Sequence, residues 1–254
     1  MILRRFMKHV TDQNWFAVGL DVLVVITGIF LGMQVQEIYG QRDDRHTEQV
    51  YLNRLHTEVV QNLGFNSDNF SALLLLENFQ QNERKLDEVL AAFDGQGALT
   101  GLTPRHCLAI MSSAIYNDQQ TYLPTLSELL ASGQLSIIES EVIKIALSEY
   151  TLAFGALKQQ VVQYLNSRTN LFQKYPEFVV IDRKMRSVAK VDEINHLCDF
   201  EAMQAHNAFN IDLTIAASKL HYFNLILANQ QESLLKVHRV LDGALDISHP
   251  EKAQ

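Results

Sequence analysis

The sequence has few residues that turn or interrupt a chain. Its 254 residues include only 11 glycines and 4 prolines, and a fold built from many short strands would need more turns than these residues supply. No tandem repeat or low-complexity run is visible. The scarcity of turn residues predicts long helices, and we expect an all-α protein whose main domain is a long-helix bundle.

Motifs of catalysis and of cofactor binding are missing as well. No serine lies in a Gly-x-Ser-x-Gly turn, and no pair of histidines has the HExxH spacing of zinc proteases. We therefore predict that the protein is not an enzyme and that it uses no cofactor and no metal. Four histidines on predicted helices are interpreted as partly exposed helix residues rather than ligands: His56, His206, His221 and His238.

Positive charge is scarce relative to negative charge. The chain has 21 lysines and arginines against 29 aspartates and glutamates, a formal net charge of −8. Residues 1–41 hold three basic and three acidic side chains, so the whole excess lies after them. An acidic domain disfavours nucleic acid and anionic lipid headgroups as partners.

One long apolar run stands out from this composition. It extends from Trp15 to Val35 and contains a single charged residue, Asp21, and a single amide, Gln34. At about 1.5 Å per residue, such a helix is roughly 30 Å long, the thickness of the hydrocarbon core of a bilayer. The run is longer than the apolar core of a signal peptide, and no small-x-small cleavage site follows it. We predict an uncleaved transmembrane helix.

The distribution of basic residues gives the orientation of this helix. Arg4, Arg5, Lys8 and the amino terminus precede it, whereas Arg42 and Arg45 follow it. The larger positive charge favours a cytoplasmic amino terminus and a periplasmic main domain in a bacterial inner membrane. The predicted parts are a cytoplasmic tail (1–14), a transmembrane helix (15–37), a helical ectodomain (38–247) and a disordered tail (248–254).

Several helices of the ectodomain have recognisable ends. Thr103-Pro104 is typical of a helix start, Thr125-x-x-Glu128 of a capping box and Gly133 of a left-handed helix end. The expected helical regions are 44–94 with a break or bend at Gly64, 104–116, a short helix opened by Thr125, 141–175 capped by Ser140, and 199–245 broken near Asn210.

Three segments resemble an uncharacterised family of bacterial single-span inner-membrane proteins. They read VVITGIFLGMQVQE in the apolar run, YLNRLHTEV after it, and LSELLASGQLSIIESEVIKIALSEY further on. The resemblance covers roughly residues 15–63 and 122–150. It implies an N-terminal anchor with an embedded acid and a helical ectodomain, and it implies no activity. From this organisation we expect an assembly, scaffold or sensing component.

Asp21 is the unusual residue of the anchor, because an ionisable group in a bilayer is costly unless it is paired or protonated. Gly28 and Gly32 follow it by seven and eleven residues, which returns them to within about 20° of the same helix face. An acid and two small residues on one face favour close packing with another helix, from a second copy or another membrane subunit. Alternatively, Asp21 carries protons in an ion-driven membrane complex, since this helix alone is similar to the anchors of stator-type proton channels.

The two cysteines, Cys107 and Cys198, leave three alternatives open. They are buried thiols, they form a disulfide, or they bind a metal with the adjacent His106 and His196. The metal is disfavoured, because side chains one or two residues apart on a helix point in different directions.

Overall fold

The computed structural model describes residues 15–64, 72–114, 121–181 and 196–248. Side chains are described for residues 22–34, 44–64, 75–114, 121–180 and 197–248. The predicted tails therefore lie outside the described residues, apart from Ser248. The chain divides into two compact units, Met1–Tyr51 and Leu52–Gln254.

The described residues are mostly helical, in agreement with the predicted all-α fold. The α-helices are α2 (Trp15–Leu63), α3 (Ala72–Phe93), α4 (Pro104–Ser112), α5 (Pro124–Ser132), α6 (Glu141–Ser167), α7 (Leu171–Lys174), α8 (Phe200–Ala205) and α9 (Asn207–Leu245). Three short 3₁₀ helices join them: η1 (Leu99–Gly101), η2 (Gln134–Ile137) and η3 (Pro176–Phe178).

Several helix ends lie where local sequence signals put them. Thr103 is the N-cap of α4, with Pro104 in its first turn, where the missing proline N–H is not needed. The Ser140 hydroxyl accepts a hydrogen bond from Ile143 N–H and caps α6. Gly64 and Gly133 end α2 and α5 with φ of 75° and 70°, a conformation that glycine adopts without steric cost.

Two predicted helices are interrupted at unexpected places. The helix predicted over 141–175 ends at Ser167, because Arg168 is extended and its guanidinium donates to the carbonyl of Ala114 at 3.0 Å. The region predicted over 199–245 breaks at His206 rather than near Asn210. The His206 ring accepts a hydrogen bond from the N–H of Phe209 at 3.1 Å and thereby caps α9.

A small antiparallel sheet adds to the helices. Strand β1 (Val179–Ile181) pairs with β2 (His196–Cys198), with Val180 opposite Leu197. β1 is a run of β-branched residues, which prefer extended backbone. The sheet is too short to change the fold class.

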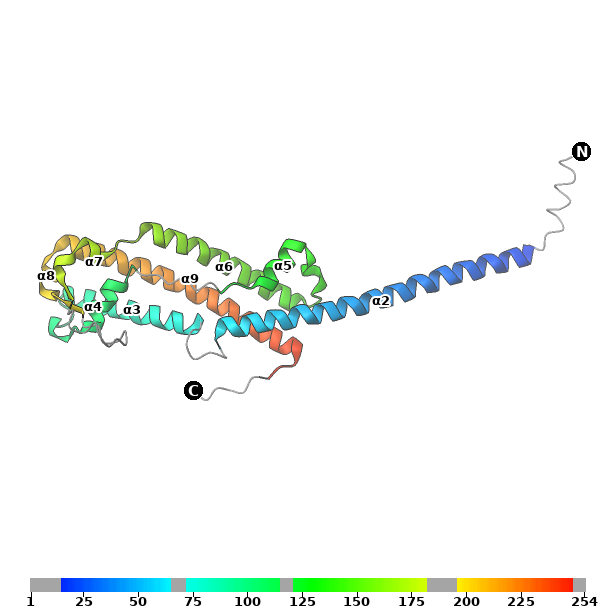
Figure 1. Ribbon diagram of the computed structural model, residues 1–254, viewed down its shortest axis with the longest axis horizontal. Coiled ribbons are helices and arrows are strands. Elements are labelled where there is room, and N and C mark those ends of the chain that lie inside the picture. The colour runs from blue at the N-terminus through cyan, green and yellow to red at the C-terminus, as the bar shows by residue number, and fades with distance from the viewer. Residues whose placement is uncertain (1–14, 65–71, 115–120, 182–195, 249–254) are drawn as a thin grey trace, which may run out of the picture. The chain divides into compact units, whose positions relative to one another are not determined.

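The core of the second unit lies between α3, α6 and α9, which run side by side (Figure 1). Phe223 of α9 is fully buried, and its ring centroid lies 5.4 Å from those of both Phe79 on α3 and Tyr164 on α6. The last turns of α2 also bury apolar side chains, among them Leu55 and Val59, each 0% exposed. A helical bundle therefore forms the second unit.

Candidate functional site

The apolar run of α2 exposes its side chains all around the helix. Nine large apolar side chains are each between 52% and 66% exposed: Val22, Leu23, Val24, Val25, Ile26, Ile29, Phe30, Leu31 and Met33. The Thr27 hydroxyl donates to the Leu23 carbonyl at 2.7 Å, so it is satisfied within the helix. Among the described residues, no helix is both long and apolar enough to cross a membrane.

The predicted packing residues of this run lie on the same helix. The backbone of Asp21 belongs to α2, but its side chain lies outside the described part. Apart from the neighbouring residues and the backbone of the same helix, no heavy atom lies within 4 Å of a Cβ built on Gly28 or Gly32. Packing inside the chain therefore does not require either glycine, although glycine in a helix interior costs about 1 kcal/mol relative to alanine.

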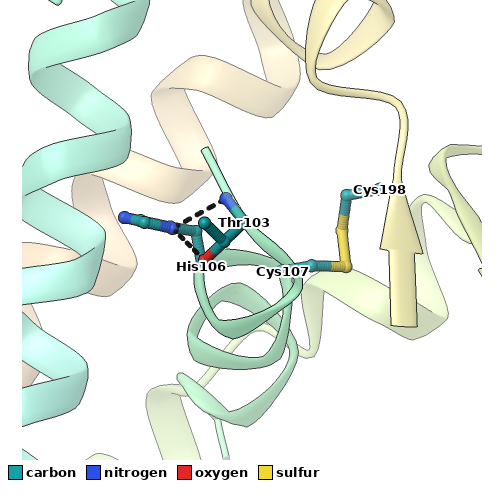
Figure 2. The surroundings of a disulfide bond; sticks show 4 residues. All are labelled: Thr103, His106, Cys107 and Cys198. Atoms are coloured by element: carbon teal, nitrogen blue, oxygen red, sulfur yellow. Dashed lines mark hydrogen bonds between the residues drawn. A yellow bond between two sulfur atoms is a disulfide. The ribbon is translucent and has the colours of Figure 1, made fainter. Parts of the chain in front are cut away.

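At one end of the bundle, the two cysteines form a disulfide bond (Figure 2). Cys107 of α4 and Cys198 of β2 have Cα atoms 5.5 Å apart and are 91 residues apart in sequence. Of the three alternatives that the sequence left open, the structure contains the disulfide. Both sulfurs are consumed by the bond, so neither is a metal ligand.

His106, beside Cys107, fixes α4 to α3 (Ala72–Phe93). Its Nδ1 accepts a hydrogen bond from the N–H of Thr103 at 3.0 Å (Figure 2). Nε2 therefore carries the ring proton, and it donates to Glu88 at 2.6 Å. Two hydrogen bonds lower the pKa of the Glu88 carboxyl: the one from Lys85 has the larger effect, and the one from His106 has the next largest. This buried histidine is structural: it closes a capping box and anchors the disulfide-bearing helix.

A second group of polar side chains lies where α2 and α9 meet. His56 Nε2 lies 2.9 Å from Asp242 Oδ1, and His238 Nδ1 lies 3.2 Å from Asp242 Oδ2. The two imidazole rings stack, with centroids 5.5 Å apart and planes 21° apart. The side chains are only 13%, 9% and 20% exposed for His56, His238 and Asp242. We call these three residues the His-Asp-His cluster.

The interpretation of the histidines as partly exposed helix residues was wrong for His238, which is buried. It agrees with His56, which is half-buried. His221 does fit the interpretation: it is 61% exposed and pairs with Glu83, whose hydrogen bond raises the pKa of the imidazole. One sequence signal was available for the cluster, since His238 and Asp242 are four residues apart on one helix face.

The His-Asp-His cluster combines groups that bind protons and metal ions. One carboxylate faces two imidazole nitrogens from two helices, and the three candidate ligand atoms all lie within 4.8 Å of one another. Among the residues whose side chains are described, this is the one such group of three. No protein-family model, no curated protein and no solved structure matches the chain.

Proposed function

We propose that the protein is a single-pass membrane protein of the bacterial inner membrane, in which residues 15–37 of α2 form the anchor. The helical bundle lies on the periplasmic side and acts in assembly or sensing. The observation that carries this proposal is the exposure of nine large apolar side chains around α2 between Val22 and Met33. Soluble proteins rarely expose a continuous apolar surface of this extent.

The energetics of this surface favour a lipid environment. Complete transfer of a valine, leucine, isoleucine or phenylalanine side chain from water to an apolar phase is favourable by about 1.5–3 kcal/mol. These side chains are about half exposed, so nine of them gain on the order of 10 kcal/mol, which is comparable to the stability of a whole domain. The Thr27 hydroxyl, bonded to its own helix, adds no unsatisfied donor in lipid.

The length of the anchor follows from the sequence around the described side chains. The described side chains of the run cover residues 22–34, and a helix needs about 20 apolar residues to span a bilayer. The sequence stays apolar from Trp15 to Val35, apart from Asp21 and Gln34. The flanking residues therefore supply the remaining length.

The disulfide supports the periplasmic side for the bundle. Disulfides persist in oxidising compartments such as the bacterial periplasm and are rare in the cytosol. The bond between Cys107 and Cys198 agrees with the orientation that the basic residues favour. Two fusions after Gln254 test it: a phosphatase that works only in the periplasm should be active, and a protein that fluoresces only in the cytoplasm should be dark. The opposite pair of results contradicts the orientation.

The anchor also carries the proposed contact to a partner helix. The empty space around Gly28 and Gly32 leaves room for a second backbone to approach closely, as small residues allow in membranes. Gly28→Ile and Gly32→Ile should weaken association of the span in a membrane reporter assay, whereas Ile26→Val, which keeps a β-branched side chain, should not. Unchanged association in both glycine variants would leave the anchor as a tether only.

Substitutions of Asp21 distinguish a role in helix association from a role in proton transfer. Asp21→Asn keeps a hydrogen-bonding group without the charge, whereas Asp21→Leu removes both. If the residue serves association, Asn is tolerated and Leu weakens assembly. If Asn abolishes function while the oligomer persists, the protein is instead an accessory subunit of an ion-driven complex.

A further inference from the structure

We propose that the His-Asp-His cluster is a binding site for one divalent transition-metal ion of the zinc class. The ligand atoms are His56 Nε2, His238 Nδ1 and one carboxylate oxygen of Asp242. The site joins the end of α2 to the end of α9, and this inference does not depend on the membrane anchor proposed above.

The present distances are close to those of a coordinated ion. Zinc–nitrogen and zinc–oxygen bonds of about 2.0–2.2 Å in a tetrahedral arrangement place two ligand atoms roughly 3.3 Å apart. Asp242 Oδ1 lies 2.9 Å from His56 Nε2, and Oδ2 lies 3.2 Å from His238 Nδ1. The three ligand atoms all lie within 4.8 Å of one another. To hold an ion through one carboxylate oxygen, the largest of these separations has to close by at most about 1.5 Å to reach the tetrahedral spacing.

The type of metal follows from the donor set. Two imidazole nitrogens and one carboxylate suit zinc, cobalt, nickel or copper, which prefer nitrogen ligands over oxygen alone. Calcium takes six to eight oxygen ligands, and magnesium keeps several waters around one or two carboxylates. Three protein ligands leave one tetrahedral position for water, and the partial exposure of His56 and Asp242 gives that water and the ion a way in.

The local backbone supports a preformed site. His238 and Asp242 lie one turn apart inside α9, so the helix fixes their spacing. Leu55, next to His56, and Leu241, next to Asp242, are both 0% exposed. The helices that carry the ligands are therefore held by the core, and binding does not have to order them.

The test is a zinc titration of the untagged full-length chain in detergent, after removal of metal, in competition with a chromophoric chelator. We expect one site per chain that competes with the chelator. Loss of groups that only support a ligand typically lowers metal affinity 10- to 100-fold, so Asp242→Asn and His56→Gln should each lower it by about 100-fold or more. Cobalt should give the visible absorption of a tetrahedral site in the wild type and lose it in both variants.

His221→Gln is the matched control, because it removes a histidine that pairs with a carboxylate, Glu83, without a third candidate ligand. This variant should bind zinc like the wild type. Zinc should also raise the melting temperature of the wild type and of His221→Gln, but not of Asp242→Asn. If Asp242→Asn fails to fold, His56→Gln carries the same test. The proposal is overturned if the wild type binds zinc no more tightly than the cluster variants. It is also overturned if His221→Gln loses as much zinc affinity as they do.

Discussion

Glu58, near the end of α2, accepts hydrogen bonds from both the backbone N–H and the hydroxyl of Thr125, in the first turn of α5. The carboxylate oxygens lie 3.1 and 3.2 Å from the nitrogen, and one lies 2.5 Å from Oγ1. The predicted capping box at Thr125 is therefore wrong: the hydroxyl is used by Glu58, and Glu128 pairs with Arg54 at 2.7 Å. A distant helix supplies the cap of α5.

Glu58→Ala should lower the free energy of unfolding by about 1–3 kcal/mol, because it removes a charged acceptor and leaves the buried Thr125 donors unsatisfied. Chemical denaturation monitored by circular dichroism measures the change. Glu149→Ala is the control: Glu149 is 47% exposed and pairs with Lys236 on the surface, so its loss should cost less than about 1 kcal/mol. Equal effects of the two substitutions would contradict the capping role of Glu58.

Loss of the disulfide should destabilise the bundle. The bond closes a loop of 91 residues between Cys107 and Cys198, and disulfides over long loops contribute about 2–4 kcal/mol by restricting the unfolded chain. Urea unfolding with and without reductant measures this contribution. The double variant Cys107→Ser, Cys198→Ser should match the reduced wild type and should not respond to reductant. An unfolding curve of the wild type that reductant does not shift would contradict the prediction.

Asp212 should make stability depend on acid pH. Two hydrogen bonds lower the pKa of the Asp212 carboxyl below its ordinary value of 3.8. The one from Lys174 has the larger effect, and the one from Tyr175 has the next largest. A carboxyl with a lower pKa in the folded state stabilises the protein above its unfolded pKa, and this stabilisation is lost as the pH falls through the folded pKa.

Asp212→Asn should therefore be less stable than the wild type at pH 6, and the difference should shrink as the pH falls below 3.8. Lys174→Met removes the first partner and should show the same trend. Thermal unfolding of the three proteins from pH 2.5 to 6.5 gives the comparison. A difference that stays constant across this range would show that the ion pair is not its source.

Most helix-end signals that act within a few residues proved reliable, whereas the capping box at Thr125 failed because the distant Glu58 uses its hydroxyl. Gly133 and Ser140 mark helix ends through their own backbone or hydroxyl, so neighbouring residues are sufficient to predict them. The break after Ser167 was missed, because it depends on the contact of Arg168 with Ala114, 54 residues earlier.

Long-range pairing explains what the sequence did not reveal about the sites. Cys107 and Cys198 are bonded only because β2 lies beside α4. The local sequence of neither segment predicts that they are neighbours. His56 meets Asp242 across 186 residues of sequence. The spacing of His238 and Asp242 shows one pair of the cluster, whereas the third member depends on how α2 packs against the bundle.

The membrane partition of the full-length chain tests the proposed function most directly. Val25→Lys with Ile29→Lys places two charges in the exposed apolar run of α2, at a cost of about 2.5–3.5 kcal/mol for each charge near the bilayer centre. Val50→Lys is the control, since Val50 is 45% exposed on the same helix but outside the run. After alkaline extraction of membranes, the wild type and Val50→Lys should stay in the pellet, and the double variant should move to the supernatant. A wild type that is extracted without detergent, or that partitions like the double variant, would contradict the anchor.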